Sequence, residues 1–306
     1  MITIIRLRRH TMQLNMRDVY DNAGKIKEEV APWLSGHKQL LALLPNLQLL
    51  DQHLISNANV SIHEEAKSGL YFSFLGTGPI KTAKDINSVQ ISYQPKNING
   101  HFLMAKGDEY SLLQTRISPA HLAAVLGETE DQIIQHFMAM RDKLGNESSV
   151  IQLPLTERTI SAIEPILAHK GHTISLAGYL YSLIFTLIEQ LQMLSHLSQC
   201  EDCQSKLFHA QNLIETPEYD TLNIKHLAQQ VGLNTEALAI GFNLIVGQPI
   251  ESYCTRSRIK FAAAQLRQNP AEKSHIVAQS GFSEDQFEAA FIQHFGVSSH
   301  QYGQIH

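Results

Sequence analysis

The pattern of a helix, a glycine turn and a second helix occurs twice in the C-terminal third of this 306-residue chain, and this repeat constrains the fold more than any other feature. In the first copy, Gly232 fits a left-handed helix end and Asn234 can cap a new helix. In the second copy, Gly281 and Ser283 hold the same places, roughly 49 residues after the first. The residues spaced for burial are Ile224, Leu227, Ala228, Val231, Leu238, Phe242, Ile245, Ile276, Val277, Phe287, Phe291 and Phe295. Each copy therefore predicts a helix-turn-helix.

The segment between the two copies, residues 247–266, predicts one long helix. Two helix-turn-helix units joined in this way, with the text LAQQVGLN, GQPIESY, RIKFAAAQL and GFS followed by FGVS, resemble the DNA-binding domain of AraC/XylS transcription regulators. The resemblance covers roughly residues 205–306. It implies a seven-helix domain whose recognition helices, about 235–245 and 284–295, enter successive major grooves about 34 Å apart. Double-stranded promoter DNA and a homodimer are the partners that it implies.

The rest of the chain carries a second, weaker resemblance. The runs LSQCEDCQSKLFHAQNLI and ISLAGYLYSLIFTLIEQL, together with a β-rich first half, resemble the siderophore-responsive, pyochelin-regulator-like branch of the family. This implies an activator whose small-molecule effector is a ferric siderophore bound by the N-terminal domain. The ligand-binding residues stay unknown, because no compact motif carries them.

Ten residues are candidates for contact with DNA. Phosphate contacts are expected from the basic residues and base-edge contacts from the polar ones. The set is Lys225, Asn234, Thr235, Glu236, Asn243, Arg256, Arg258, Lys260, Gln286 and His294. Arg258 has an alternative role as a structural residue of the linking helix, and Asn243 and Gln286 have an alternative as ordinary solvated surface.

Charge and side-chain chemistry argue against strong DNA binding by this copy. The chain has a net charge of −5, and residues 205–306 hold seven basic and nine acidic side chains, a net of −2. Glu236, Ala239 and Ile240 occupy recognition positions, although the last two cannot hydrogen-bond a base edge. Glu284 and Asp285 open the second recognition helix, where they suit the helix dipole but repel phosphate. The alternative function is therefore a degenerate interaction protein that has lost autonomous DNA readout and acts through a partner regulator.

Further departures from the family pattern concern packing in the second unit. Lys273 and Val277 stand where an apolar residue and a small alanine are usual, so we expect looser packing there. Ser299 and Gly303 replace the usual proline and arginine of the closing segment, and the turn before Phe287 is one residue shorter than usual.

The first two thirds of the chain change hydrophobic period once. From about Leu47 to Ser118 apolar residues alternate, which predicts antiparallel strands, and after Ser118 the spacing becomes helical, with helices near 119–126, 130–144, 155–169 and 174–197. The fold class is therefore α+β: a β-rich, barrel-like N-terminal domain with following helices, residues 1–200, and an all-α double helix-turn-helix domain, residues 201–306.

Two features of the N-terminal domain leave alternatives open. Leu180, Ile184, Leu187, Leu191 and Leu194 follow heptad spacing, which fits either core packing or a dimer seam. A set of aromatic and polar residues could line a pocket, although core packing is the alternative for the aromatic members. This set is Phe72, Phe74, Tyr93, His101, Phe102, Tyr110 and Arg116.

The remaining motifs support neither catalysis nor a cofactor. LGTGP, residues 75–79, lacks the further residues of a nucleotide-binding loop and fits a hairpin turn. Cys200 and Cys203 form a C-x-x-C, which suits half a metal site, a redox dithiol or incidental linker cysteines, and we assign no metal to it. Three cysteines, a charged start MITIIRLRRH without signal-peptide features, and an uncharged run too short and polar to cross a membrane lead us to expect a cytoplasmic protein. The sequence contains no nucleophile elbow, zinc-protease helix or paired-carboxylate motif, so we expect no enzyme.

Overall fold

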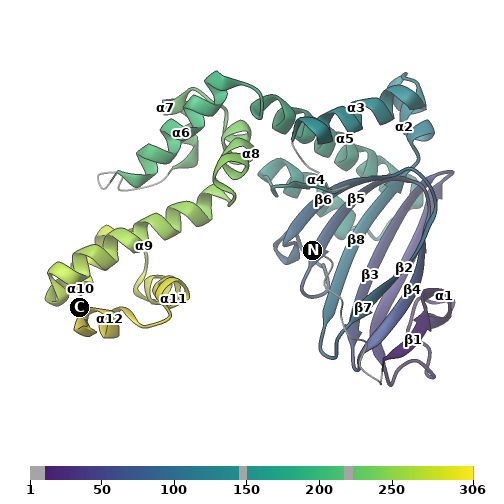
Figure 1. The fold of residues 1–306 in the computed structure, drawn as a ribbon, viewed down its shortest axis with the longest axis horizontal. Coiled ribbons are helices and arrows are strands. Elements are labelled where there is room, and N and C mark those ends of the chain that lie inside the picture. The colour runs from purple at the N-terminus through teal and green to yellow at the C-terminus, as the bar shows by residue number, and fades with distance from the viewer. Residues whose placement is uncertain (1–10, 145–149, 217–222, 306) are drawn as a thin grey trace. The chain divides into compact units, whose positions relative to one another are not determined.

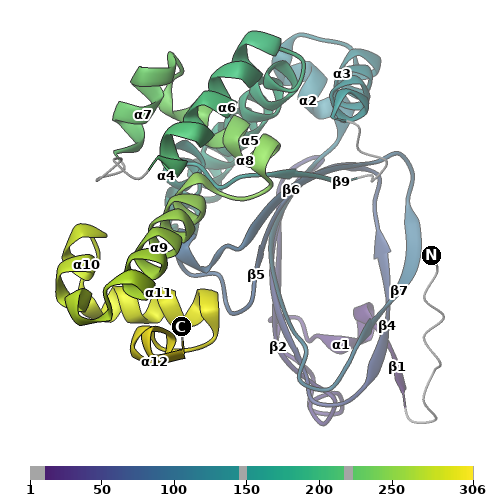
Figure 2. The ribbon, with the colours of Figure 1, turned by 60° about the vertical axis from the view of Figure 1, so that its left-hand side comes forward.

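The computed structural model of the chain describes residues 11–144, 150–216 and 223–305. The first ten residues, in which we expect no signal peptide, lie outside the described residues. The chain divides into two compact units, residues 1–192 and 193–306. Figure 1 and Figure 2 together label the helices and strands of both.

The N-terminal unit is built on two β-sheets. Its strands are β1 (Met12–Asn15), β2 (Leu34–Leu44), β3 (Leu47–Ser56), β4 (Val60–Ala66), β5 (Gly69–Gly76), β6 (Ser88–Gln94), β7 (Ile98–Met104), β8 (Glu109–Ile117) and β9 (Val150–Leu153). Six strands form one sheet in the order β2-β3-β8-β5-β6-β9, with every neighbouring pair antiparallel. The other sheet has the order β1-β4-β7, in which β1 runs parallel to β4. The predicted β-rich region is confirmed, and β1, β2 and β9 extend it beyond the predicted range.

Alternation of side chains decides which face of the large sheet is buried. On β5, Leu70, Phe72 and Phe74 are at most 3% exposed, and the partners of the last two on β6, Ile91 and Val89, are equally buried. Figure 2 shows the two sheets facing each other, and one core cluster joins residues of both. That cluster contains Met16, Val19, Val30, Leu34, Leu54, Val60, Ile62 and Met104. The short helix α1 (Met16–Val19) contributes the first two.

Among the described residues, four further α-helices follow β8 before the C-terminal unit's own helices, with β9 between the second and the third of them. They are α2 (Pro119–Leu126), α3 (Glu130–Lys143), α4 (Glu157–Leu167) and α5 (Thr173–Leu197). Ser118 caps α2 by accepting a hydrogen bond from the His121 N–H, and Gly127 ends it at φ 72°. These are the signals that the sequence carries, and the predicted helices are confirmed.

Helix α5 is a core helix. By length and composition it is long and apolar enough to cross a membrane, but half of its most apolar 18-residue stretch is buried inside the protein. The heptad-spaced residues Leu180, Ile184, Leu187, Leu191 and Leu194 are each at most 5% exposed. Core packing, the first of the two alternatives, is therefore what this stripe does, and a dimer seam on these residues is excluded by their burial.

The C-terminal unit contains the double helix-turn-helix. Its helices are α6 (Glu201–Glu215), α7 (Ile224–Val231), α8 (Thr235–Val246), α9 (Ile250–Gln268), α10 (Lys273–Gln279), α11 (Glu284–Phe295) and α12 (Ser299–Ile305). One core cluster joins α6, α7, α8 and the start of α9, and a second joins the rest of α9 with α10, α11 and α12. Helix α9 therefore connects two separately packed units, as the sequence predicts.

Candidate DNA-binding surface and effector cavity

The first helix-turn-helix is α7, the turn at Gly232 and α8. Asn223 caps α7, and Gly232 ends it at φ 70°, a conformation that glycine adopts without strain. The side chain of Asn234 accepts a hydrogen bond from the Ala237 N–H at 2.7 Å, so this predicted base-edge residue is the N-cap of α8. Capping uses the Asn234 oxygen and leaves its amide nitrogen for another partner.

The other residues of α8 at recognition positions expose few polar groups. Thr235, Glu236 and Asn243 are half-buried, and Ile240 is 0% exposed. Helix α8 therefore presents few groups that could hydrogen-bond a base edge, as the sequence indicated.

The second helix-turn-helix is α10, the turn at Gly281 and α11. Ser283 and Gln286 form a capping box, in which the Gln286 side-chain oxygen accepts from the Ser283 N–H at 3.2 Å. Gln286 is exposed, but its acceptor oxygen is therefore already used within the helix start. Glu284 and Asp285 are also exposed on this first turn, so α11 begins with negative charge on its surface. The start of α11 is thus capped by the side chains of Ser283 and Gln286.

Packing in the second unit is tight, contrary to the expectation drawn from Lys273 and Val277. Val277 is 3% exposed in the core cluster that holds Phe287 and Phe291. Lys273 Nζ lies 3.4 Å from Glu288 Oε2. Glu288 also accepts from the Ser299 backbone N–H at 2.9 Å and from Ser299 Oγ at 2.6 Å. The expectation of looser packing is wrong at these positions, because Val277 is buried in the core and Lys273 and Ser299 both bind Glu288.

We call Lys273, Glu288 and Ser299 the Glu288 clamp, because they join α10, α11 and α12. Burial alone would raise the pKa of Glu288, but the two hydrogen bonds from Ser299 and the charge of Lys273 hold it below its ordinary value. The carboxylate is therefore ionised at neutral pH.

Basic groups gather on α9 and α11. Arg256 and Lys260 lie four residues apart on α9, and His294 lies in the last turn of α11. Burial, followed by the charges of Lys260 and Arg256, lowers the pKa of His294, so these three groups are close enough to interact electrostatically. Arg256 is held by stacking over the Tyr253 ring at 5.1 Å. The structure thus brings together three of the predicted phosphate and base-edge residues.

Lys225 and Arg258 have different surroundings. Lys225 is exposed in the first turn of α7, where its backbone N–H donates to the cap residue Asn223. Arg258 lies over the Phe282 ring at 4.3 Å and donates to the Ser280 carbonyl at 3.4 Å. It therefore supports the second turn, which is the structural alternative weighed for it, and we leave Arg258 out of the DNA contacts proposed below.

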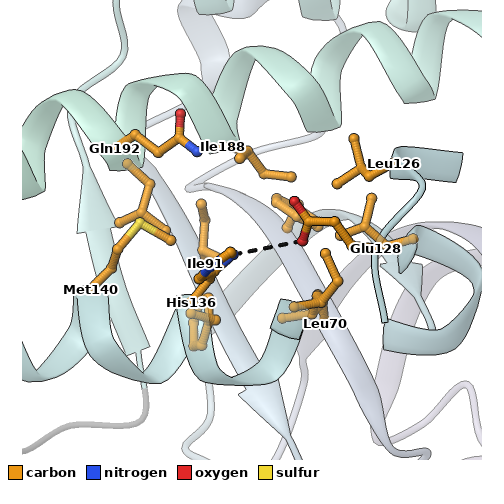
Figure 3. Close-up of a pocket in the computed structure, with 13 residues that line it drawn as sticks. Leu70, Ile91, Leu126, Glu128, His136, Met140, Ile188 and Gln192 are labelled. Atoms are coloured by element: carbon orange, nitrogen blue, oxygen red, sulfur yellow. Dashed lines mark ion pairs between the residues drawn. The ribbon is translucent and has the colours of Figure 1, made fainter. Parts of the chain in front are cut away.

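A cavity of about 70 Å³ lies in the N-terminal unit, between the large sheet and helices α2, α3 and α5 (Figure 3). Its lining comprises Leu70, Phe72, Ile91, Leu122, Leu126, Glu128, Ile133, His136, Phe137, Met140, Ile188, Leu191 and Gln192. His136 Nδ1 lies 3.6 Å from Glu128 Oε2, and the His136 side chain is 66% exposed. The cavity is thus an apolar chamber with a polar pair that solvent reaches, which is the usual form of a small-molecule site.

Of the residues predicted to line a pocket, Phe72 alone is among those that line this cavity. Tyr93 packs against the lining residue Phe137 at 6.3 Å between ring centroids. Phe102 packs on the core between the sheets, and Arg116 donates to the Ser68 carbonyl. The helical part of the lining was missed, although Ile133, Phe137 and Met140 recur at i, i+4 and i+7 on α3, a spacing that marks an inward face.

No protein-family model matches the chain, and no curated protein matches it. Among solved structures it is similar to a protein of unknown function from Listeria innocua, at 23% identity over 34% of this chain and 95% of that one, with a TM-score of 0.29. It is also similar to ToxT from Vibrio cholerae, at 10% identity over 85% and 99% of the two chains, with a TM-score of 0.27. An unsaturated fatty acid-bound ToxT matches at 9% identity over 83% and 94%, with a TM-score of 0.26.

Proposed function

We propose that this chain is a transcription regulator of AraC/XylS type, with an effector domain in residues 1–200 and a DNA-binding domain in residues 201–306. The observation that carries the proposal is the pair of capped helix-turn-helix units at the two ends of α9. A lone helical hairpin is common, whereas two of them sharing one linking helix match the family pattern in the sequence. An activating role, a homodimer and a cytoplasmic location belong to the same proposal.

In this proposal DNA phosphates contact Lys225, Arg256 and Lys260, and His294 joins them when it is protonated. The base-edge contacts come from Thr235, Glu236, Asn243, Gln286 and the free amide nitrogen of Asn234. Since these groups are few and partly used in helix caps, sequence discrimination by a single copy is weak. Two copies on adjacent half-sites would add their contacts.

The test is a binding titration of the full chain against DNA from upstream of its own gene, over a range of salt concentrations. The logarithm of the binding constant should fall linearly with the logarithm of salt concentration, and removal of one phosphate contact should reduce that slope by about 0.9. Arg256→Ala and Lys260→Ala should each do so. Lys206→Ala is the matched control, because Lys206 pairs with Asp202 on α6 and is not among the proposed contacts.

A second candidate function is supported by the net charge of −2 in residues 205–306 and by the acidic start of α11. In it the chain keeps the fold, has no DNA readout of its own and acts by pairing with another regulator. If the chain does not bind DNA even at about 50 mM salt, where electrostatic contacts with phosphate are strong, the first function is excluded. The interaction protein is then the function that is left.

The effector in our proposal is a small, largely apolar molecule with one polar group, because the cavity is apolar except near Glu128 and His136. A ferric siderophore remains a prediction of the sequence resemblance, and the lining favours the smaller apolar molecule.

The cavity is tested with anilinonaphthalene sulfonate, a fluorescent dye with apolar rings and one anionic group, titrated into the full chain. Ile188→Trp places extra volume in the cavity and should weaken dye binding by about tenfold or more, since every 1.4 kcal/mol is a factor of ten. Ile174→Trp is the same substitution on the same helix at a position that is 87% exposed, and it should leave binding unchanged. Equal dye binding by both variants and the natural chain would remove the cavity as the effector site.

A further inference from the structure

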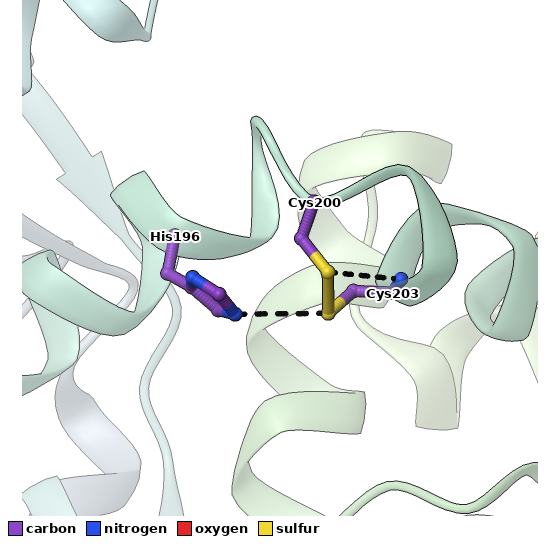
Figure 4. Close-up of side chains that lie close together, drawn as sticks. All are labelled: His196, Cys200 and Cys203. Atoms are coloured by element: carbon purple, nitrogen blue, oxygen red, sulfur yellow. Dashed lines mark hydrogen bonds between the residues drawn. A yellow bond between two sulfur atoms is a disulfide. The ribbon is translucent and has the colours of Figure 1, made fainter.

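Cys200, Cys203 and His196 gather where α5 ends and α6 begins, and none of them belongs to the cavity lining or to the proposed DNA contacts (Figure 4). Cys200 and Cys203 form a disulfide, with their Cα atoms 5.2 Å apart. His196 Nε2 lies 3.8 Å from Cys203 Sγ. Both cysteines are half-exposed and His196 is exposed, so reagents in solution reach the group.

The two sulfur atoms have different surroundings. Cys200 is the N-cap of α6, and its sulfur accepts a hydrogen bond from the Cys203 backbone N–H at 3.2 Å. A helix N-terminus and an N–H donor both stabilise a thiolate. The acidic residues Glu201 and Asp202 oppose this effect, but Asp202 is paired with Lys206 Nζ at 2.5 Å. Cys200 is therefore the better nucleophile, and Cys203 has the imidazole beside it as a proton acceptor.

We propose that Cys200 and Cys203 are a reversible dithiol–disulfide centre that reacts with small disulfides of the glutathione class. The Cys200 thiolate attacks one sulfur of the small disulfide, which forms a mixed disulfide and releases one small thiolate. Cys203 then passes its proton to His196 Nε2 and attacks the Cys200 sulfur, which releases the second small thiolate. The protein dithiol loses two electrons and two protons, and the small disulfide becomes two thiols.

A metal site is the competing use of the same residues. The reduced group would offer two sulfurs and one nitrogen within 4.8 Å, one ligand fewer than the four of a structural zinc site. The disulfide form offers no thiolate at all. The remaining cysteine, Cys254, takes no part, because it is 3% exposed in the core and burial raises the pKa of its thiol to about 12.

The test equilibrates the full chain in buffers of defined glutathione and glutathione disulfide ratio, followed by trapping with a maleimide and mass spectrometry. As the proportion of glutathione disulfide rises, maleimide labelling of Cys200 and Cys203 should fall together in one two-electron transition. Cys254→Ser should leave the midpoint of that transition unchanged. Cys203→Ser should accumulate a stable mixed disulfide at Cys200. Cys200→Ser should form one at Cys203 about tenfold more slowly, because Cys203 lacks the N-cap position.

His196→Gln separates a proton acceptor from a residue that only packs. It should slow closure of the mixed disulfide near neutral pH without moving the midpoint, since a base changes the rate and not the equilibrium. Full labelling of Cys200 and Cys203 in excess glutathione disulfide would overturn the proposal. So would stoichiometric zinc in the isolated chain that blocks their oxidation, because the group would then be a metal site. DNA titrations do not enter this test, so its outcome is separate from that of the proposed function.

Discussion

The Glu288 clamp makes a specific prediction about the second helix-turn-helix. Glu288→Ala removes the acceptor for the backbone N–H and the hydroxyl of Ser299, a residue that is 1% exposed. Burying polar groups without a partner costs about 1–3 kcal/mol. The ion pair with Lys273 adds little, since its two side chains are 38% and 30% exposed. We expect a loss of about 3 kcal/mol in the local stability of α12, combining these two principles.

The assay is amide hydrogen exchange of the full chain, read on peptides from α12. A loss of about 3 kcal/mol accelerates exchange about a hundredfold, because 1.4 kcal/mol is a factor of ten. Glu288→Gln keeps an acceptor for Ser299 and should accelerate exchange only about fivefold, the effect of about 1 kcal/mol. Lys273→Ala, which removes the ion pair alone, should resemble the glutamine variant.

Acidification tests the same group. Because the folded pKa of Glu288 lies below its ordinary value, its stabilising effect is complete above that ordinary value and is lost as pH falls through the folded pKa. The glutamine variant should lack this loss. If alanine and glutamine at position 288 give equal exchange in α12, Ser299 does not depend on the carboxylate and the reasoning is refuted.

Two further predictions follow from the same unit and from α5. Burial and nearby positive charges lower the pKa of His294, so the unfolded chain binds more protons than the folded one just below pH 6.5, and the free energy of unfolding should fall as pH drops through this window. His294→Gln should flatten this part of a denaturation-against-pH curve, and an unchanged slope would contradict the assignment. A Cβ on Gly241 would meet Leu207 Cδ1 at 2.5 Å, whereas one on Gly178 in α5 would meet nothing within 4 Å. Gly241→Ala should therefore lower the free energy of unfolding by about 1–3 kcal/mol through overpacking. Gly178→Ala should raise it by about 0.5–1 kcal/mol. Chemical denaturation monitored by circular dichroism measures both changes, and stabilisation by both substitutions would show that Leu207 moves aside freely.

The acidic character of the C-terminal unit has a definite location. Glu284 and Asp285 are exposed on the first turn of α11, whereas Glu288 on the next turn is used in the clamp. The exposed pair stabilises the helix start through the dipole and repels a phosphate that approaches it. The basic groups Arg256 and Lys260 lie on α9, so attraction and repulsion come from different elements of the same unit.

Local pattern was sufficient wherever a residue acts on its own neighbours in the chain. Ser118 and Gly127 at the ends of α2, and Gly232 and Asn234 in the first turn, act through backbone geometry and hydrogen bonds within a few residues. The elements that they bound were therefore predictable from sequence. Strand β2 was missed because its alternation is weak, with Leu40 exposed on a strand that lies at the edge of its sheet.

The sequence by itself determined the double helix-turn-helix, the change from strands to helices and the acidic balance, because periodicity, caps and charge are properties of consecutive residues. Tertiary structure alone decided what distant residues do to one another. In the folded chain Lys273 and Ser299 bind Glu288, and Arg258 contacts the turn of the second helix-turn-helix. His294 lies near Arg256 and Lys260, and the large sheet and three helices line a cavity. These contacts join residues 11 or more positions apart, and their free energy depends on distance and burial, which spacing along the chain does not contain.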